Sequence, residues 1–182
     1  VSKLKYQEEI DYLVSYAPRN NFIKNLAIDQ DGNTLVLFNY VEKHGVPLFR
    51  LIQDGVHKNR KVFFVHGGTD TKTREEIRGI TENEKDAIII ASYGTFSTGI
   101  NIRNLHNIIF ASPSKSRIRN LQSIGRGLRL GDNKTSATLY DIADDMTYHS
   151  RENFTLKHFQ ERINIYTEEE FDYEFHNVQL KD

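Results

Sequence analysis

The chain has 182 residues, which is enough for one domain or two small ones. Hydrophobic residues make up 38% of it and charged residues 27%, Cys is absent, and the formal net charge is -1. This composition excludes a disulfide scaffold and a thiol nucleophile. It also argues against bulk attraction to DNA, although a local basic patch stays possible. The apolar runs are too short to cross a membrane and no signal peptide opens the chain, so we expect a cytoplasmic protein without a membrane partner.

Short apolar runs recur along the chain and predict the strands of a sheet. They are near-continuously apolar, which is typical of strands buried on both faces. The runs are Thr34–Phe38, Val62–Val65, Ala87–Ala91, Asn107–Phe110 and Ala137–Ile142. Polar stretches long enough for helices separate most of them, at Asn39–Asp54, Thr71–Glu84 and Lys115–Leu130. This alternation predicts a parallel sheet with helices on both faces.

Helices are also predicted at both ends of the chain. Lys3–Tyr16 and Arg19–Asp29 have a helical pattern, and Pro18 between them would set the start of the second helix. After the last strand, Tyr148–Glu170 predicts one long helix, and the alternation of aromatic and acidic residues in Phe171–Phe175 predicts a final strand.

The helix predicted over Thr71–Glu84 contains a capping-box candidate, Thr73 with Glu76 three residues later.

The segment QSIGRGLR, Gln122–Arg129, carries the most specific pattern. On a helix, Gln122, Gly125, Arg126 and Arg129 share one face, while the neighbouring Leu and Ile side chains can dock on the sheet. Glycine inside a helix costs about 1 kcal/mol, so this helix is not built for stability alone. Close approach of a polyanion to two forked guanidinium groups would explain the pattern. The alternative is a surface helix whose arginines pair with nearby carboxylates.

The pattern Q-x-x-G-R-x-x-R resembles motif VI of superfamily 2 helicases, and other motifs of that family's second RecA-like domain precede it in the family's order. Thr34–Tyr40 is similar to motif IV, Val65–Thr69 with Arg74–Arg78 to motif IVa and its helix, and Ala91–Ile102 to motif V. The resemblance covers Asn33–Asp145.

The resemblance implies an α/β fold of the RecA-like, P-loop NTPase type. This is a three-layer sandwich with a mostly parallel central sheet. Residues 1–32 would then be a helical lead-in, 33–146 the second RecA-like domain, and 147–182 a C-terminal helix and strand that complete or extend it.

For the nucleotide, the resemblance implies that Arg126 and Arg129 are catalytic arginine fingers. Gln122, Gly125, Gly99 and Asn101 would bind the nucleotide. Asn101 stands where the family has Asp, so it can hydrogen-bond a ribose hydroxyl but carries no charge.

For nucleic acid, motif V offers hydroxyls and flexible glycines, which suit contacts to a phosphate backbone. The glycines after Val65 follow the carboxyl end of a parallel strand, where ligands bind in open α/β sheets. The predicted contacts are Asn39, Gly67, Gly68, Thr69, Thr95, Ser97 and Thr98. Alternatives stay open: His66 is a packed or capping residue, the motif V loop only turns the chain, and Arg117 and Arg119 are solvated cations.

The sequence lacks the phosphate-binding loop G-x-x-x-x-G-K-[ST] and the Asp-Glu pair that a motor needs for Mg²⁺. Gly131–Thr135 contains a Lys-Thr pair without the required glycine spacing. We therefore expect no metal site in this chain and no activity from it alone. ATP and Mg²⁺ would be held mainly by a first RecA-like domain of the same protein, which is one expected partner.

The other expected partner is DNA, single-stranded or a branched duplex. The predicted function is the C-terminal motor half of an ATP-dependent DNA helicase that regresses forks and migrates junctions in recombination and repair. One alternative is a non-catalytic RecA-like module that binds nucleic acid or a partner. A dinucleotide enzyme is disfavoured because no G-x-G-x-x-G follows the first strand.

Overall fold

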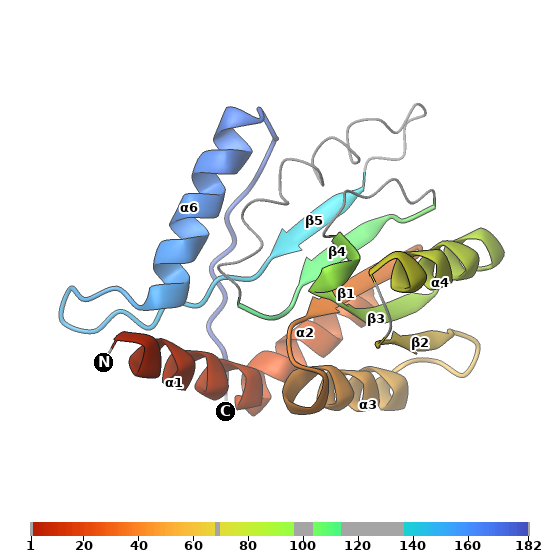
Figure 1. Ribbon diagram of the computed structural model, residues 1–182, viewed down its shortest axis with the longest axis horizontal. Coiled ribbons are helices and arrows are strands. Elements are labelled where there is room, and N and C mark those ends of the chain that lie inside the picture. The colour runs from red at the N-terminus through yellow and green to blue at the C-terminus, as the bar shows by residue number, and fades with distance from the viewer. Residues whose placement is uncertain (1, 68–69, 97–103, 114–136, 182) are drawn as a thin grey trace.

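The computed structural model describes residues 2–67, 70–96, 104–113 and 137–181. These form a five-stranded sheet in the order β2-β3-β1-β4-β5, and every strand pair is parallel (Figure 1). The strands are β1 (Thr34–Phe38), β2 (Val62–Val65), β3 (Ile88–Ser92), β4 (Asn107–Phe110) and β5 (Thr138–Asp141). All five predicted strands are therefore present, with ends that differ by no more than one residue.

Helices cover both faces of the sheet, as the sequence predicts (Figure 1). They are α1 (Ser2–Ser15), α2 (Ala17–Asp29), α3 (Val46–Gly55), α4 (Asp70–Asn83) and α6 (Phe154–Glu168), with a π-helical turn η1 (Val41–Gly45) and a 3-10 turn η2 (Tyr93–Phe96). The predicted helix Lys115–Leu130 lies outside the described residues.

Alternate side chains of central strand β1 enter two separate cores. Val36 and Phe38 pack with Ile23 of α2 and Ile52 of α3. Leu35 and Leu37 point the other way, into a core that also contains Ile77 of α4 and Tyr166 of α6. Because the whole of β1 is buried, its continuous apolar run is explained by two covered faces.

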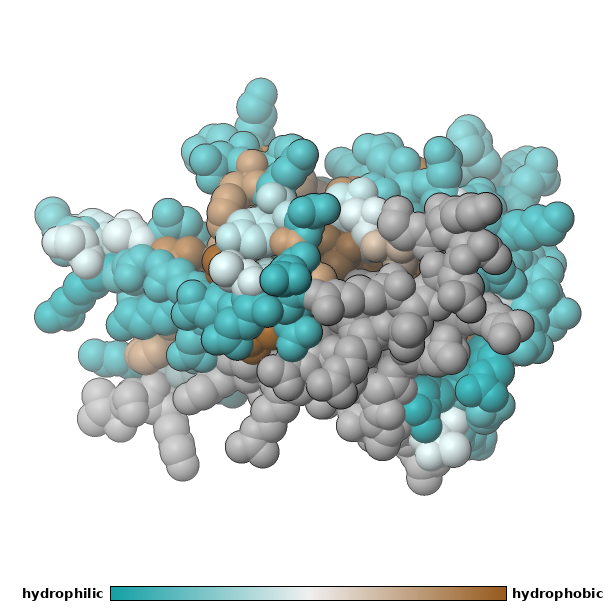
Figure 2. Space-filling model, turned by 90° about the horizontal axis from the view of Figure 1, so that it is seen from above, coloured by the Kyte–Doolittle hydropathy of each residue, from teal (hydrophilic) through white to brown (hydrophobic). Residues whose placement is uncertain are grey.

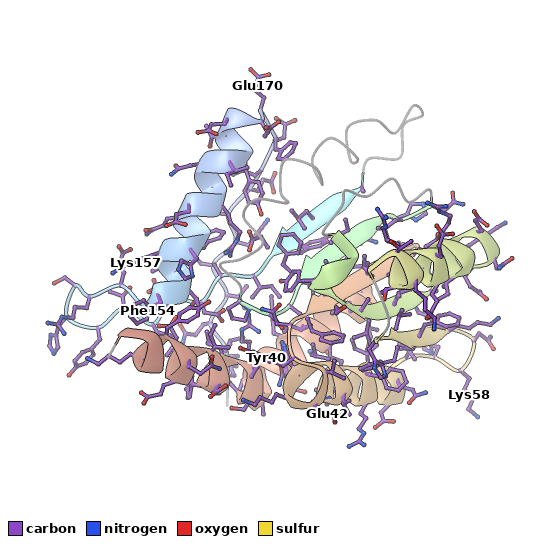
Figure 3. The ribbon with its side chains drawn as sticks, in the orientation of Figure 1. Tyr40, Glu42, Lys58, Phe154, Lys157 and Glu170 are labelled. Carbon is purple, nitrogen blue, oxygen red and sulfur yellow. The ribbon has the colours of Figure 1, made fainter. Side chains whose placement is uncertain are left out.

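The helices before residue 33 pack on the domain rather than standing apart. Ile23 and Ala27 of α2 are fully buried, and Pro18 lies in the first turn of this helix, which begins at Ala17. Phe154, at the start of α6, lies beside α1 and packs edge-on to Tyr6 with ring centroids 5.9 Å apart (Figure 3). The division of the chain at residues 32 and 146 stays a prediction.

Of the two elements predicted at the C-terminal end, the helix is present but starts later, and the strand is wrong. The helix begins at Phe154, not Tyr148, because His149 and Ser150 have positive φ angles that a right-handed helix excludes. No strand forms over Phe171–Phe175, and residues 171–181 have no regular secondary structure. The ring of Phe171 still packs near Tyr166, so the apolar alternation reflects packing rather than a strand.

The capping box is also wrong. Helix α4 starts at Asp70, so Thr73 lies inside it, where the Thr73 hydroxyl donates to the Gly67 carbonyl at 3.2 Å. This bond ties the helix to the end of β2 instead of capping it.

On the face seen from above, most of the described residues are polar (Figure 2). Seen from above, hydrophilic residues cover most of the outline, and the apolar residues that show lie in the middle of the view (Figure 2). None of the helices described is both long and apolar enough to cross a membrane.

Candidate nucleotide and nucleic-acid site

The candidate site lies at the carboxyl edge of the sheet. The strand register aligns Leu37 with Ala91 on one side and with Phe110 on the other, so β1, β3 and β4 end side by side. Parallel sheets of this kind bind ligands beyond the carboxyl ends of their strands. The predicted site residues all follow β1, β2, β3 or β4 in the sequence.

Three of the predicted site residues belong to the described part of the chain. These are Asn39, Gly67 and Thr95, the last with its backbone only, in η2. The others lie outside the described residues, and their roles stay predictions: Gly68, Thr69, Ser97, Thr98, Gly99, Asn101, Gln122, Gly125, Arg126 and Arg129.

Asn39 is half-buried and bonded to the loop after β4. Its backbone N–H donates to the Ser112 hydroxyl at 3.0 Å, and its side-chain amide reaches the Pro113 carbonyl at 3.5 Å. Asn39 therefore ties the end of β1 to the end of β4. Its contact with nucleic acid stays a prediction.

Gly67 is exposed and has φ +77°, a conformation that favours glycine. A Cβ atom placed there would meet nothing within 4 Å, so the backbone conformation, not crowding, explains the residue. The neighbouring His66 is exposed but packs edge-on to Phe64, with ring centroids 4.6 Å apart. This contact favours the packed alternative for His66, whose role stays a prediction.

Ser112 is a polar residue at this edge with several hydrogen bonds, and it was not predicted from the sequence. It is 4% exposed. Its hydroxyl lies 2.6 Å from Nδ1 of His44 and accepts the Asn39 N–H. Its carbonyl accepts the hydroxyl of Tyr93 at 2.7 Å. Ser112 therefore joins η1 and the ends of β1, β3 and β4.

The protonation state of His44 follows from its partners. Its Nε2 lies 2.9 Å from Oδ1 of Asn20, whose amide nitrogen is already donating to the Val14 carbonyl. Oδ1 can only accept, so Nε2 carries the proton and Nδ1 accepts from the hydroxyl of Ser112. Burial and, secondarily, the charge of Arg19 lower the pKa of His44 from 6.5 to about 3. His44 is thus a neutral, orienting residue.

Arg19 holds the same loop from the opposite side. It is 1% exposed, donates from Nη1 to the Ala111 carbonyl at 2.6 Å, and pairs through Nε and Nη2 with the Asp144 carboxylate at 2.8 and 3.0 Å. Lead-in helix α2 is therefore bonded directly to the loop that leaves β4.

A second buried ion pair closes the end of β5. Arg162 donates from Nε and Nη2 to Asp141 at 2.7 and 2.8 Å, and the Tyr166 hydroxyl donates to the same carboxylate at 2.6 Å. Burial alone would lower the pKa of Arg162, but the charge and hydrogen bonds of Asp141 outweigh it and raise that pKa. Burial, followed by the charge of Asp141, raises the pKa of Tyr166. This ion pair fastens α6 to the sheet.

The five-stranded parallel sheet and its helical layers match the fold of RecA-like domains from the C-terminal half of helicases. The family described as helicase conserved C-terminal domain matches residues 18–131, and the chain belongs to that family. It is similar to the ATP-dependent DNA helicase UvsW of Enterobacteria phage T4, with 40% identity over 98% of this chain and 38% of that protein.

Solved structures agree on the fold. The crystal structure of T4 UvsW matches with a TM-score of 0.71 and 40% identity, over 93% of this chain and 37% of that one. The C-terminal part of the Fun30 ATPase domain matches with a TM-score of 0.50 and 18% identity, over 84% of this chain and 54% of that one. The latter likeness supports the fold alone. The chain spans less than two fifths of UvsW.

Proposed function

We propose that this chain is the second motor domain of an ATP-dependent DNA helicase or translocase. The observation that carries the proposal is the 40% identity with UvsW, which extends over 98% of the chain and so includes the segment Gln122–Arg129. The described fold adds support, because β4, the last described strand before that segment in the sequence, ends at the edge where parallel sheets bind ligands.

In this proposal Arg126 and Arg129 act on a nucleotide bound by the first RecA-like domain. In hydrolysis, water attacks the γ-phosphorus of ATP, the bond to the bridging oxygen breaks and ADP leaves, with Mg²⁺ held mainly by the first domain. The arginines would stabilise the negative charge on the γ-phosphate oxygens during this step, and Gln122, Gly125, Gly99 and Asn101 would contact the nucleotide. An arginine finger contributes roughly 10³ to 10⁵ in rate. The chain's own sequence contains no phosphate-binding loop, so it fits the accessory side of such a site.

The proposed DNA contacts grip the backbone without reading bases. They come from the ends of three strands, through Asn39, Gly67, Gly68, Thr69, Thr95, Ser97 and Thr98. Branched DNA, such as forks and four-way junctions in recombination and repair, is the proposed substrate. Backbone contacts predict binding that falls steeply with salt and depends little on sequence.

The test is ATP hydrolysis by the full-length protein with forked DNA. Arg129→Ala should lower the rate by roughly 10³ or more while ATP binding, measured by a fluorescent nucleotide, persists. Arg50→Ala, at an exposed position of α3, is the control and should keep wild-type turnover. Wild-type turnover by Arg129→Ala would overturn the finger assignment. A wild-type protein that binds DNA but hydrolyses no ATP would instead be the non-catalytic module.

A further inference from the structure

Ser112 stands two residues before the chain enters 114–136, the segment that contains the proposed arginine fingers. Two of the three loops that carry proposed DNA contacts are hydrogen-bonded to this residue. The loop after β1 reaches the Ser112 hydroxyl through the Asn39 N–H, and η2, which opens the motif V segment, reaches the Ser112 carbonyl through the Tyr93 hydroxyl. The two loops therefore share one buried attachment point, which stands two residues before that segment in the sequence.

The hydrogen bonds of Ser112 leave it little freedom to adjust. Its hydroxyl donates to Nδ1 of neutral His44 and accepts the Asn39 N–H, and its carbonyl accepts the Tyr93 hydroxyl. The side chains of His44 and Tyr93 are 0% and 3% exposed, so water cannot readily replace a broken bond. Leaving a buried polar group unpaired is unfavourable. When either loop shifts slightly, its hydrogen bond to Ser112 is therefore kept and Ser112 moves with the loop.

We propose that Ser112 is a positioning residue that couples nucleic-acid contact at the ends of β1 and β3 to the placement of the arginine fingers. The inference rests on the proposed motor function. Nucleic acid that moves the Asn39 or Tyr93 loop displaces the start of the finger segment through Ser112. His44 and Asn20 hold the Ser112 hydroxyl in the orientation that accepts the Asn39 N–H.

The experiment measures ATP hydrolysis by the full-length protein with and without saturating forked DNA. Ser112→Ala should lower the ratio of stimulated to basal rate by about 2- to 30-fold, the range expected when a residue on a coupling route is changed. The KM for ATP and the affinity for DNA, measured by anisotropy, should stay within about twofold of wild type, because the residue touches neither ligand.

Thr34→Val provides the matched control for a purely structural effect. Thr34 is fully buried, and its hydroxyl also makes two hydrogen bonds, donating to the Gly32 carbonyl and accepting from Asn107. It stands at the amino end of β1, away from the proposed site. The control should lower the melting temperature as Ser112→Ala does, yet keep the stimulation ratio.

Tyr93→Phe removes only the hydroxyl that bonds Ser112. If both loops act through Ser112, the double variant Tyr93→Phe with Ser112→Ala should lower the ratio by less than the product of the two single effects. Fully multiplicative effects, or equal ratios for Ser112→Ala and Thr34→Val, would overturn the inference in an active enzyme. A wild-type protein without DNA-stimulated hydrolysis would instead overturn the proposed function itself.

Discussion

Glu9 of α1 caps α6, because its Oε2 accepts the backbone N–H of Thr155 at 2.7 Å across 146 residues of sequence. Its Oε1 accepts the Phe154 N–H at 3.0 Å. Asn153 occupies the N-cap position but makes no side-chain cap bond there, since its carbonyl oxygen accepts from the Met146 N–H. A carboxylate from another helix thus takes the place of a local cap, and it meets the positive end of the α6 dipole.

Glu9→Ala should therefore lower the free energy of unfolding by about 1–2 kcal/mol, the usual effect of losing a helix cap. Glu9→Gln should lower it less, because one oxygen still accepts a hydrogen bond. Denaturant unfolding measures the change. Glu8→Ala, an exposed neighbour on the same helix, is the control and should stay within about 0.5 kcal/mol of wild type. Equal values for Glu8→Ala and Glu9→Ala would contradict the capping role.

This contact also shows which features of the fold could not be predicted from the sequence. The strands could be predicted because each is a local apolar run, and β1 was placed to the residue at Thr34–Phe38. The start of α6 could not be, because its cap is Glu9, which lies in another helix. The turn before it depends on two residues, His149 and Ser150, whose positive φ angles no local composition announces.

The candidate site shows the same difference between local patterns and long-range contacts. Motif spacing predicted which segments follow the strands, because a motif is a local pattern. Ser112, His44 and Arg19 were missed, because each acts through a partner more than 60 residues away. Only the fold brings the Ser112 hydroxyl to His44 or the Ala111 carbonyl to Arg19.

The buried ion pair at the end of β5 predicts a large effect on stability. Asp141→Asn removes the negative charge opposite Arg162, which is 6% exposed and would be left buried without a counter-ion. Breaking one side of such a pair costs about 3–5 kcal/mol. Asp172→Asn, an exposed acid just beyond α6, should change the free energy of unfolding by less than about 0.5 kcal/mol. Similar unfolding midpoints for the two variants would show that the Asp141 pair is dispensable.

His44 predicts a loss of stability in mild acid. The fold lowers the pKa of His44 from 6.5 to about 3. Between these pH values His44 is protonated in the unfolded chain but neutral in the native state. The contribution of His44 to the free energy of unfolding is therefore fully present above pH 6.5, and it is lost as the pH falls from 6.5 toward 3. At pH 5 the loss is about 2 kcal/mol, from about 1.4 kcal/mol per pH unit for one proton.

The measurement compares urea unfolding at pH 7.5 and pH 5 in wild type and in His44→Gln. Glutamine can still donate toward Asn20 and accept from Ser112, but it does not titrate in this range. The variant should therefore lose about 2 kcal/mol less than wild type between the two pH values. His57→Gln, at an exposed position, is the control and should keep the wild-type dependence. An unchanged pH dependence in His44→Gln would assign the loss to other groups.

The same substitution at two helical glycines should have opposite effects. A Cβ atom at Gly45 would lie 2.7 Å from the ring of Phe38, which is fully buried and cannot withdraw, so Gly45→Ala should destabilise by about 1–3 kcal/mol. A Cβ atom at Gly79 in α4 would meet nothing within 4 Å, and alanine is the better helix former. Gly79→Ala should therefore stabilise by about 0.5–1 kcal/mol. Thermal unfolding of both variants measures the signs, and a Gly45→Ala midpoint at or above that of wild type would show that η1 can move away from β1.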